Sequence, residues 1–195
     1  EPANVIDSRL DPERLKPYDH ELEYREGNGE PILTLGGKRL VSASCFWDPS
    51  FGRPDTRGRP VGDGCVIAAV FTDADGDYWL HGIDYLSFRP ELADEIDEAT
   101  QLCRQAVAFA RRHFVPAVSI ETNGVGKFLP GLFRRELNRA DLACAVIEHT
   151  SSRNKVDRIL EAFDAVLAAG RLRASRRALA SPFVTEMREW CPDVS

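Results

Sequence analysis

The chain has 195 residues, 43% of them hydrophobic and 9% aromatic, which is enough for the core of one globular domain. The net charge of −6 argues by itself against a nucleic-acid partner, and no apolar stretch approaches the roughly 18 residues that cross a bilayer. The five cysteines are odd in number and widely spaced, which favours reduced core residues over a disulfide or zinc framework and predicts a cytoplasmic protein.

The first 38 residues are dense in charges and contain four prolines, so we expect them to be a lead-in or linker outside the core. The chain begins at Glu1 rather than Met, which indicates an excised fragment. We therefore divide the chain into a lead-in, residues 1–40, and one domain, residues 41–195.

Three apolar runs predict that the domain opens with antiparallel strands over residues 41–47, 65–71 and 78–83. The second and third strands flank a cluster of Asp73, Asp75, Gly76 and Asp77. This cluster lacks the spacing and the closing Glu of an EF-hand calcium loop, so a hairpin turn explains it better.

Helices and strands alternate over the rest of the chain. Apolar residues recur every three or four positions from 91 to 113, which predicts an amphipathic helix. Further elements follow as a strand over 117–120, a helix over 125–138, a strand over 142–147 and a helix over 154–169. The expected architecture is thus a mixed α/β sheet of three antiparallel strands followed by helix-linked strands, with helices on both faces.

Two acids directly follow predicted strands. Asp48 closes the first strand and Glu121 closes the fourth, and α/β sheets place ligands at the carboxyl ends of strands. Two neighbouring carboxylates there would hold a divalent metal, and Mg²⁺ or Mn²⁺ selects carboxylate oxygen over Cys and His. The alternative is that each acid is an Asx-turn or cap residue at a strand exit.

The charges are distributed unevenly. Residues 125–180 hold eleven Lys or Arg and six Asp or Glu, a net charge of +5, which leaves −11 for the remainder. Such an asymmetry can build a basic face for phosphates, although solvated helix surfaces give the same count.

Several short segments, taken in their order and spacing from about Val41 to the chain end, resemble one family. They are Phe46-Trp-Asp48-Pro-Ser, Gly62-Asp-Gly-Cys-Val-Ile67, Asp73 to Trp79, Ser119-Ile-Glu121-Thr-Asn-Gly-Val-Gly126, Ser152-Arg-Asn-Lys155-Val-Asp-Arg158-Ile and Leu167-Ala-Ala-Gly170-Arg-Leu. Together they resemble the C-terminal nuclease domain of the large terminase subunit of tailed phages, prophages and gene-transfer agents. The resemblance implies a ribonuclease H-like fold and a metal-dependent endonuclease that cuts double-stranded DNA during genome packaging.

The family uses three acids and divalent metals. By resemblance, Asp48 is the first acid, Glu121 the second, and Asp63 an extra acid near the metals. Asp193 is the one acid that the chain offers for the third position, which we expect beyond Ser195. The implied cofactors are two Mg²⁺ or Mn²⁺ ions, with one activating water and the other stabilising the leaving oxygen.

Basic residues border the expected site. Lys155 and Arg158 share a face at the start of a helix, where they would contact the DNA backbone or form an ordinary solvated surface. His149, just past the fifth strand, would assist proton transfer or contact phosphate, or be a loop histidine with no part in the chemistry. Further DNA-contact candidates are Arg153 and, from the loop after Asp48, Arg53, Arg57 and Arg59.

The resemblance also implies partners: double-stranded DNA, an ATPase motor domain, the small terminase subunit and the portal, in the cytoplasm of a bacterial host and without a membrane. The chain has no P-loop pattern, so the ATPase half is expected to precede the lead-in. The incomplete set of acids leaves an alternative open, a DNA- or protein-docking module of a packaging motor that does not cut.

Overall fold

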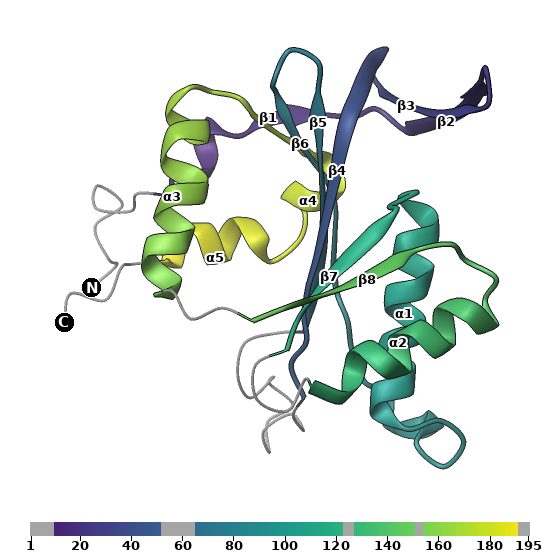
Figure 1. The fold of residues 1–195 in the computed structure, drawn as a ribbon. Coiled ribbons are helices and arrows are strands. Elements are labelled where there is room, and N and C mark those ends of the chain that lie inside the picture. Colours follow the sequence, from purple (N-terminus) through teal and green to yellow (C-terminus); the bar gives the residue numbers. More distant parts are fainter. Residues whose placement is uncertain (1–9, 52–64, 123–126, 151–153, 191–195) are drawn as a thin grey trace. The chain divides into compact units, whose positions relative to one another are not determined.

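Nine strands of the described residues form one mixed sheet (Figure 1). The computed structural model describes residues 10–51, 65–122, 127–150 and 154–190, except for the Lys155 side chain. The sheet order is β1-β9-β6-β5-β4-β3-β2, with β7 beside β4 and β8 beside β7. The strands are β1 (Lys16–Tyr18), β2 (Leu22–Gly27), β3 (Glu30–Leu35), β4 (Lys38–Asp48), β5 (Val66–Asp73), β6 (Tyr78–Tyr85), β7 (Ala117–Glu121), β8 (Ala145–His149) and β9 (Leu172–Ser175).

Five α-helices and two short 3-10 helices are present in the described part of the chain. None of these helices combines the length and the apolar character that crossing a membrane requires. They are η2 (Pro12–Arg14), η3 (Pro90–Leu92), α1 (Glu98–Arg112), α2 (Leu129–Arg139), α3 (Lys155–Ala168), α4 (Arg176–Leu179) and α5 (Phe183–Glu189).

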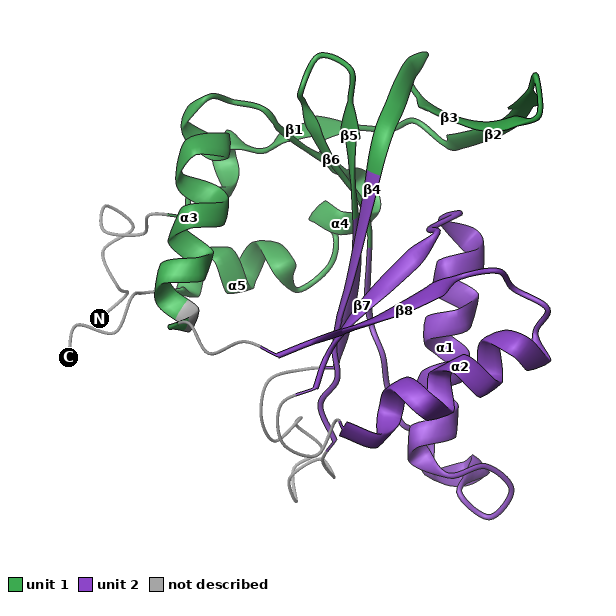
Figure 2. Ribbon diagram, viewed as in Figure 1, with its two compact units in different colours: residues 1–42, 70–82, 152–195 green, residues 43–69, 83–151 purple. Residues whose placement is uncertain are grey.

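The chain divides into two compact units (Figure 2). Unit 1 comprises residues 1–42, 70–82 and 152–195, and unit 2 comprises residues 43–69 and 83–151. Three of the four boundaries fall within β4, β5 and β6, so each of these strands contributes residues to both units.

In unit 1, the described residues between 10 and 35 correct the expectation that residues 1–38 lie outside the core. They include β1, β2 and β3, and β1 pairs in parallel with β9 while β3 pairs antiparallel with β4. Leu10, Leu15, Tyr18 and Leu35 are buried. Charges and prolines mask these strands in the sequence: residues 23–26 of β2 are exposed, and β3 opens with the exposed Glu30 and Pro31 before its half-buried and buried residues.

The turn between β5 and β6 is organised by a buried acid, Asp73, which is 2% exposed. Its carboxylate accepts hydrogen bonds from Trp79 Nε1 at 3.0 Å and from the backbone N–H groups of Asp75 and Asp77 at 2.9 and 3.0 Å. Burial alone would raise the pKa of the Asp73 carboxyl, but these hydrogen bonds outweigh it and hold that pKa below its usual value.

The other two acids of this turn are paired with basic side chains of unit 1. Asp75 forms an ion pair with Lys38, and Asp77 accepts from Arg173 Nη2 at 2.8 Å. The Arg173 guanidinium also lies over the Trp79 ring, 4.7 Å from its centroid. The cluster is therefore a hairpin turn with internal partners, as the spacing of its acids predicts.

Unit 2 is built on β7 and β8, with α1 and α2 packed beside them. Helix α1 begins at Glu98, seven residues later than the periodicity predicts, because Asp97 caps it: the Asp97 carboxylate accepts from the Thr100 N–H at 2.9 Å. The segment before this cap contains the short η3 helix. Helix α2 begins at Leu129, and residues 123–126 of its expected first turn lie outside the described residues.

The cysteines of the described residues are free thiols, as expected. Cys45, Cys65 and Cys103 are buried and Cys144 is half-buried. Burial raises the pKa of both the Cys45 and the Cys103 thiol to about 12, so these side chains behave as small core residues.

We expect Asp73→Ala to lower the free energy of unfolding by about 3 kcal/mol, because three donors lose a charged acceptor. A depressed pKa stabilises the fold above the unfolded-state value near 4, so this contribution should be lost as pH falls through the lower folded-state pKa. Urea unfolding at neutral and acid pH measures both effects.

Asp75→Ala is the matched control, since Asp75 lies in the same turn with its side chain 63% exposed. It should cost much less than Asp73→Ala. Equal losses for the two variants would contradict the role assigned to Asp73.

Candidate functional site

The two acids that close predicted strands lie at the ends of neighbouring parallel strands in unit 2. Strand β4 ends at Asp48 and β7 ends at Glu121. The strands pair in parallel with Phe46 opposite Ser119 and Trp47 opposite Ile120, so the next positions in register are Asp48 and Glu121. Residues in register project from the same face of a sheet, which places both carboxylates on one face at one edge.

Trp47 fixes the direction in which Asp48 projects. The Trp47 side chain is fully buried, its Nε1 donates to Cys65 Sγ at 3.3 Å, and its ring meets Phe133 of α2 edge-on with centroids 5.4 Å apart. Because successive side chains of a strand alternate, Trp47 points towards α2 and Asp48 points away from it. Asp48 itself is half-buried.

Glu121 stands between two buried residues, Ile120 and Thr122. The Thr122 N–H donates to the backbone oxygen of His149 at 2.9 Å, and the Thr122 hydroxyl bonds that of Thr150 at 3.0 Å. These bonds hold the chain after β7 against the end of β8. Thr122 was not singled out from the sequence; the signal for it is a polar residue next to an acid at a strand exit.

His149 joins the same edge. Strand β8 spans 145–149 instead of the expected 142–147, so His149 is the last residue of the strand and lies in register with Glu121. Its ring meets Phe46 edge-on at a centroid distance of 5.6 Å. The expected strand began too early because Leu142 and Cys144 are half-buried without belonging to it.

Glu148 is an acid at the same edge that can be compared with Asp48 and Glu121. It precedes His149 on β8, and alternation places it on the opposite face of the sheet. There its Oε1 accepts from Arg134 Nη2 of α2 at 3.0 Å. Neighbouring acids at this edge therefore face different surroundings, with Glu148 towards α2 and Glu121 towards the opposite side.

Of the expected acids, the structure brings Asp48 and Glu121 together at this edge. Within the described ranges, no group of three or more His, Cys, Asp or Glu side chains is arranged to hold a metal ion. Asp63 and Asp193, expected as further acids, lie outside the described residues. A pair of carboxylates nevertheless fits Mg²⁺, which keeps several waters and takes one or two carboxylates together with substrate phosphate.

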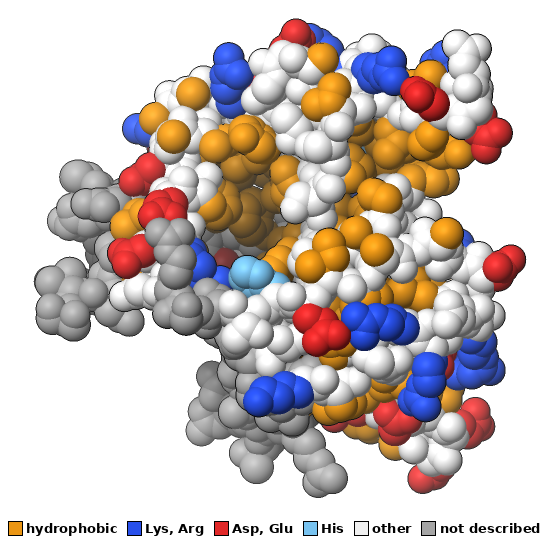
Figure 3. Space-filling view, viewed as in Figure 1, with side chains coloured by type: hydrophobic (Ala, Val, Ile, Leu, Met, Phe, Trp, Pro, Cys, Tyr) orange, Lys and Arg blue, Asp and Glu red, His pale blue; other side chains and the backbone are white. Residues whose placement is uncertain are grey.

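Most of the expected DNA contacts lie outside the described residues: Arg53, Arg57, Arg59, Arg153 and the side chain of Lys155. Lys155 opens α3, whose N-cap Asn154 accepts from the Val156 N–H at 2.8 Å. Arg158, on the same helix, is half-buried, and its buried Nε has no hydrogen-bond partner among the described residues. On the face shown in Figure 3, basic and acidic side chains are interspersed.

The strand order and the helices give this chain a ribonuclease H-like mixed α/β fold, as the sequence predicts. A similar solved structure is the nuclease domain of the large terminase subunit gp2 of bacterial virus Sf6. The two chains are 13% identical with a TM-score of 0.50, and the match covers 78% of this chain and 71% of that one. The likeness establishes the fold.

Two mutant structures of the Sf6 protein also match. One is its nuclease domain with manganese and beta-thujaplicinol, at 13% identity and a TM-score of 0.48, covering 76% of this chain and 69% of that one. The other, with calcium, has 12% identity and a TM-score of 0.49, covering 78% and 71%. No protein-family model matches the chain. No curated protein sequence matches it either.

We expect Asp48→Asn and Glu121→Gln each to weaken Mn²⁺ binding about tenfold or more, because the amide keeps the shape of the side chain but removes a charged ligand. Isothermal titration of the 195-residue chain with Mn²⁺ measures the affinity. Glu148→Gln serves as the control, since this acid lies at the same strand end on the opposite face. An equal loss for Glu148→Gln, or no loss for either site variant, would contradict the assignment.

Proposed function

We propose that this chain is a divalent-metal-dependent endonuclease domain that cuts double-stranded DNA during viral genome packaging, as the nuclease part of a large terminase subunit. One observation carries the proposal: Asp48 and Glu121 end adjacent parallel strands, in register and on the same face, in a ribonuclease H-like fold. The order of the family-like segments in the sequence supports it.

The chemistry of the two carboxylates explains why a metal is needed. Asp48 and Glu121 carry negative charge at an edge where the DNA phosphate is also negative, so they would repel the substrate without a cation between them. Mg²⁺ or Mn²⁺ held by Asp48 and Glu121, two ions in our proposal, would supply the charge neutralisation and Lewis acidity that phosphodiester hydrolysis requires. In the net reaction water adds to phosphorus and one P–O ester bond breaks.

Other residues of the edge position these acids. Trp47 anchors the end of β4, and Thr122 ties the segment after β7 to the end of β8. We propose that His149, which lies on β8 in register with Glu121, contacts the DNA phosphate. Asp63 and Asp193 remain our candidates for further acids.

A second candidate function is a docking module of a packaging motor that binds DNA or protein without cutting. The observation that favours it is the absence of a third acidic or histidine ligand beside Asp48 and Glu121 within the described residues. The two functions differ in one respect that can be measured, since only the nuclease gains activity when Mn²⁺ is added.

The proposed setting follows from the same family. We propose that an ATPase motor domain precedes the first 40 residues, and that small terminase subunit and portal are partners in the cytoplasm of a bacterial host. Because β1 pairs with β9, part of this lead-in belongs to the folded sheet of the nuclease domain, which we otherwise place at residues 41–195.

Plasmid nicking tests the proposal. With Mn²⁺ present, Asp48→Asn and Glu121→Gln should each lower the nicking rate about 100-fold or more, because each removes one of two charges that hold the ion. Glu148→Gln should nick at the rate of the unchanged chain. Undiminished cutting by either site variant would assign the chemistry elsewhere, and an inactive parent chain that still binds DNA would favour the docking module.

DNA affinity should depend steeply on salt and little on sequence, because contacts to the phosphate backbone release counterions. Replacing Lys155 and Arg158 together by Ala should weaken binding of random duplexes and lower the salt slope by up to about two units. Fluorescence anisotropy over a salt series measures the slope. If the double variant keeps the same affinity and salt slope, both residues belong to an ordinary solvated helix surface and do not contact DNA.

A further inference from the structure

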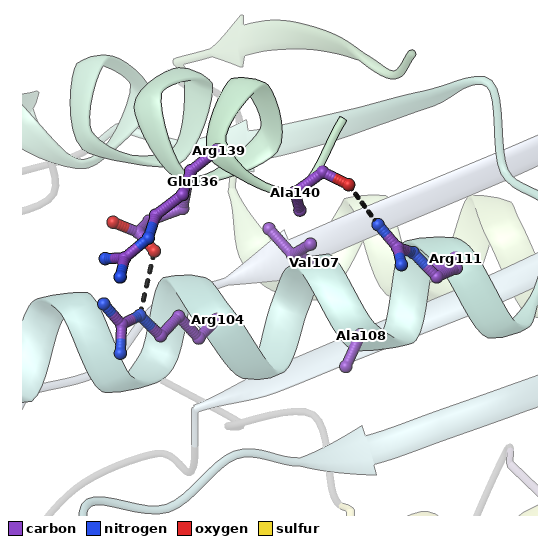
Figure 4. Close-up of a pocket in the computed structure, with 7 residues that line it drawn as sticks. All are labelled: Arg104, Val107, Ala108, Arg111, Glu136, Arg139 and Ala140. Carbon is purple, nitrogen blue, oxygen red and sulfur yellow. Dashed lines mark hydrogen bonds and ion pairs between the residues drawn. The ribbon is translucent and has the colours of Figure 1, made fainter. Parts of the chain in front are cut away.

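A groove with a volume of about 460 Å³ lies between α1 and α2 in unit 2 (Figure 4). Each helix contributes residues three or four positions apart, so each wall is one continuous stripe of a helix. The α1 stripe begins and ends with arginine and is aliphatic between them. The lining residues are Arg104, Val107, Ala108 and Arg111 of α1 and Glu136, Arg139 and Ala140 at the end of α2.

The single carboxylate of the groove is already neutralised. Glu136 Oε2 accepts from Arg104 Nε at 2.9 Å, and the Glu136 side chain is only 12% exposed. At the other end of the groove, Arg111 donates to the backbone oxygen of Ala140, just past the last turn of α2 (Figure 4). These contacts hold two guanidinium groups in place at opposite ends.

The arginines of the groove carry more positive charge than its one carboxylate neutralises, so a negatively charged ligand can bind there. Arg139 is exposed, and among the described residues no ion pair joins it to an acid. The bonds of Arg104 and Arg111 within this groove use one N–H group each, whereas a guanidinium has five. Three guanidinium groups against one paired carboxylate give the groove a net charge of about +2.

The space between the charges is apolar. Val107 is 7% exposed, and it lines the groove together with the half-buried Ala140 and the exposed Ala108. The backbone positions of Arg104 and Arg111 are seven residues apart on α1, which corresponds to a rise of roughly 10 Å. An extended peptide covers roughly that distance in three residues. Duplex DNA presents mainly phosphates to a protein surface, and its thymine methyl groups lie at base edges within the major groove rather than beside the phosphates.

We propose that this groove binds a short acidic segment of a partner protein, in which carboxylates flank aliphatic residues. The carboxylates contact the guanidinium groups at the two ends, with Arg139 adding charge, and the aliphatic side chains cover Val107 and the two alanines. The groove includes neither Asp48 nor Glu121, so the proposal does not depend on the nuclease activity.

The test uses the full 195-residue chain and the synthetic peptide Asp-Glu-Leu-Leu-Glu-Asp, followed by NMR chemical shifts of backbone amides. We expect shifts concentrated on the facing stripes of α1 and α2, and no such shifts with the charge-reversed peptide Lys-Lys-Leu-Leu-Lys-Lys. Arg139→Glu should weaken the peptide about tenfold, because it replaces an attractive charge by a repulsive one. Asp48→Asn should leave binding unchanged.

Arg135→Glu is the matched control, since Arg135 is exposed on the same helix one turn earlier and does not line the groove. It should change the affinity by less than about twofold. The proposal is wrong if no amide of α1 or α2 shifts, if Arg135→Glu and Arg139→Glu weaken the peptide equally, or if a short random duplex displaces the peptide and shifts the same residues.

Discussion

The parallel pairing of β4 with β7 is the constraint on which the candidate site depends. It sets Trp47 opposite Ile120, and both side chains are completely buried. A shift of one residue would expose Trp47 and turn Asp48 towards α2, so the register is enforced by burial of the aromatic ring. Burial of Trp47 and Ile120, one position earlier on each strand, therefore makes Asp48 and Glu121 project from the same face of the sheet.

The same alternation gives unit 2 two different surfaces, for which we propose different roles. One face of the β4, β7 and β8 ends carries Asp48, Glu121 and His149, and it is the face at which we propose that DNA is cut. The other face carries Trp47 and Glu148 against α2, which together with α1 forms the arginine-rich groove. Catalysis and partner binding are thus assigned to different elements, and variants of one are controls for the other.

The sequence predicts the strands that end in Asp48 and Glu121 because their apolar runs are sharply bounded. It misses β2 because most of its residues are exposed, and β3 because the strand opens with the exposed Glu30 and Pro31. It displaces β8 because Glu148 and His149 are exposed strand residues without an apolar signal. The groove is also not predicted, since Arg104 and Arg139 line the same groove only because α1 packs against α2. Asp63 and Asp193 remain predictions.

Anomalous diffraction from crystals of this chain grown with Mn²⁺ tests the central claim most directly. It locates the ion without requiring activity or DNA. We predict an anomalous peak about 2 Å from carboxylate oxygens of both Asp48 and Glu121, at the ends of β4 and β7. A well-occupied peak at other acids, with none beside this pair, would contradict it.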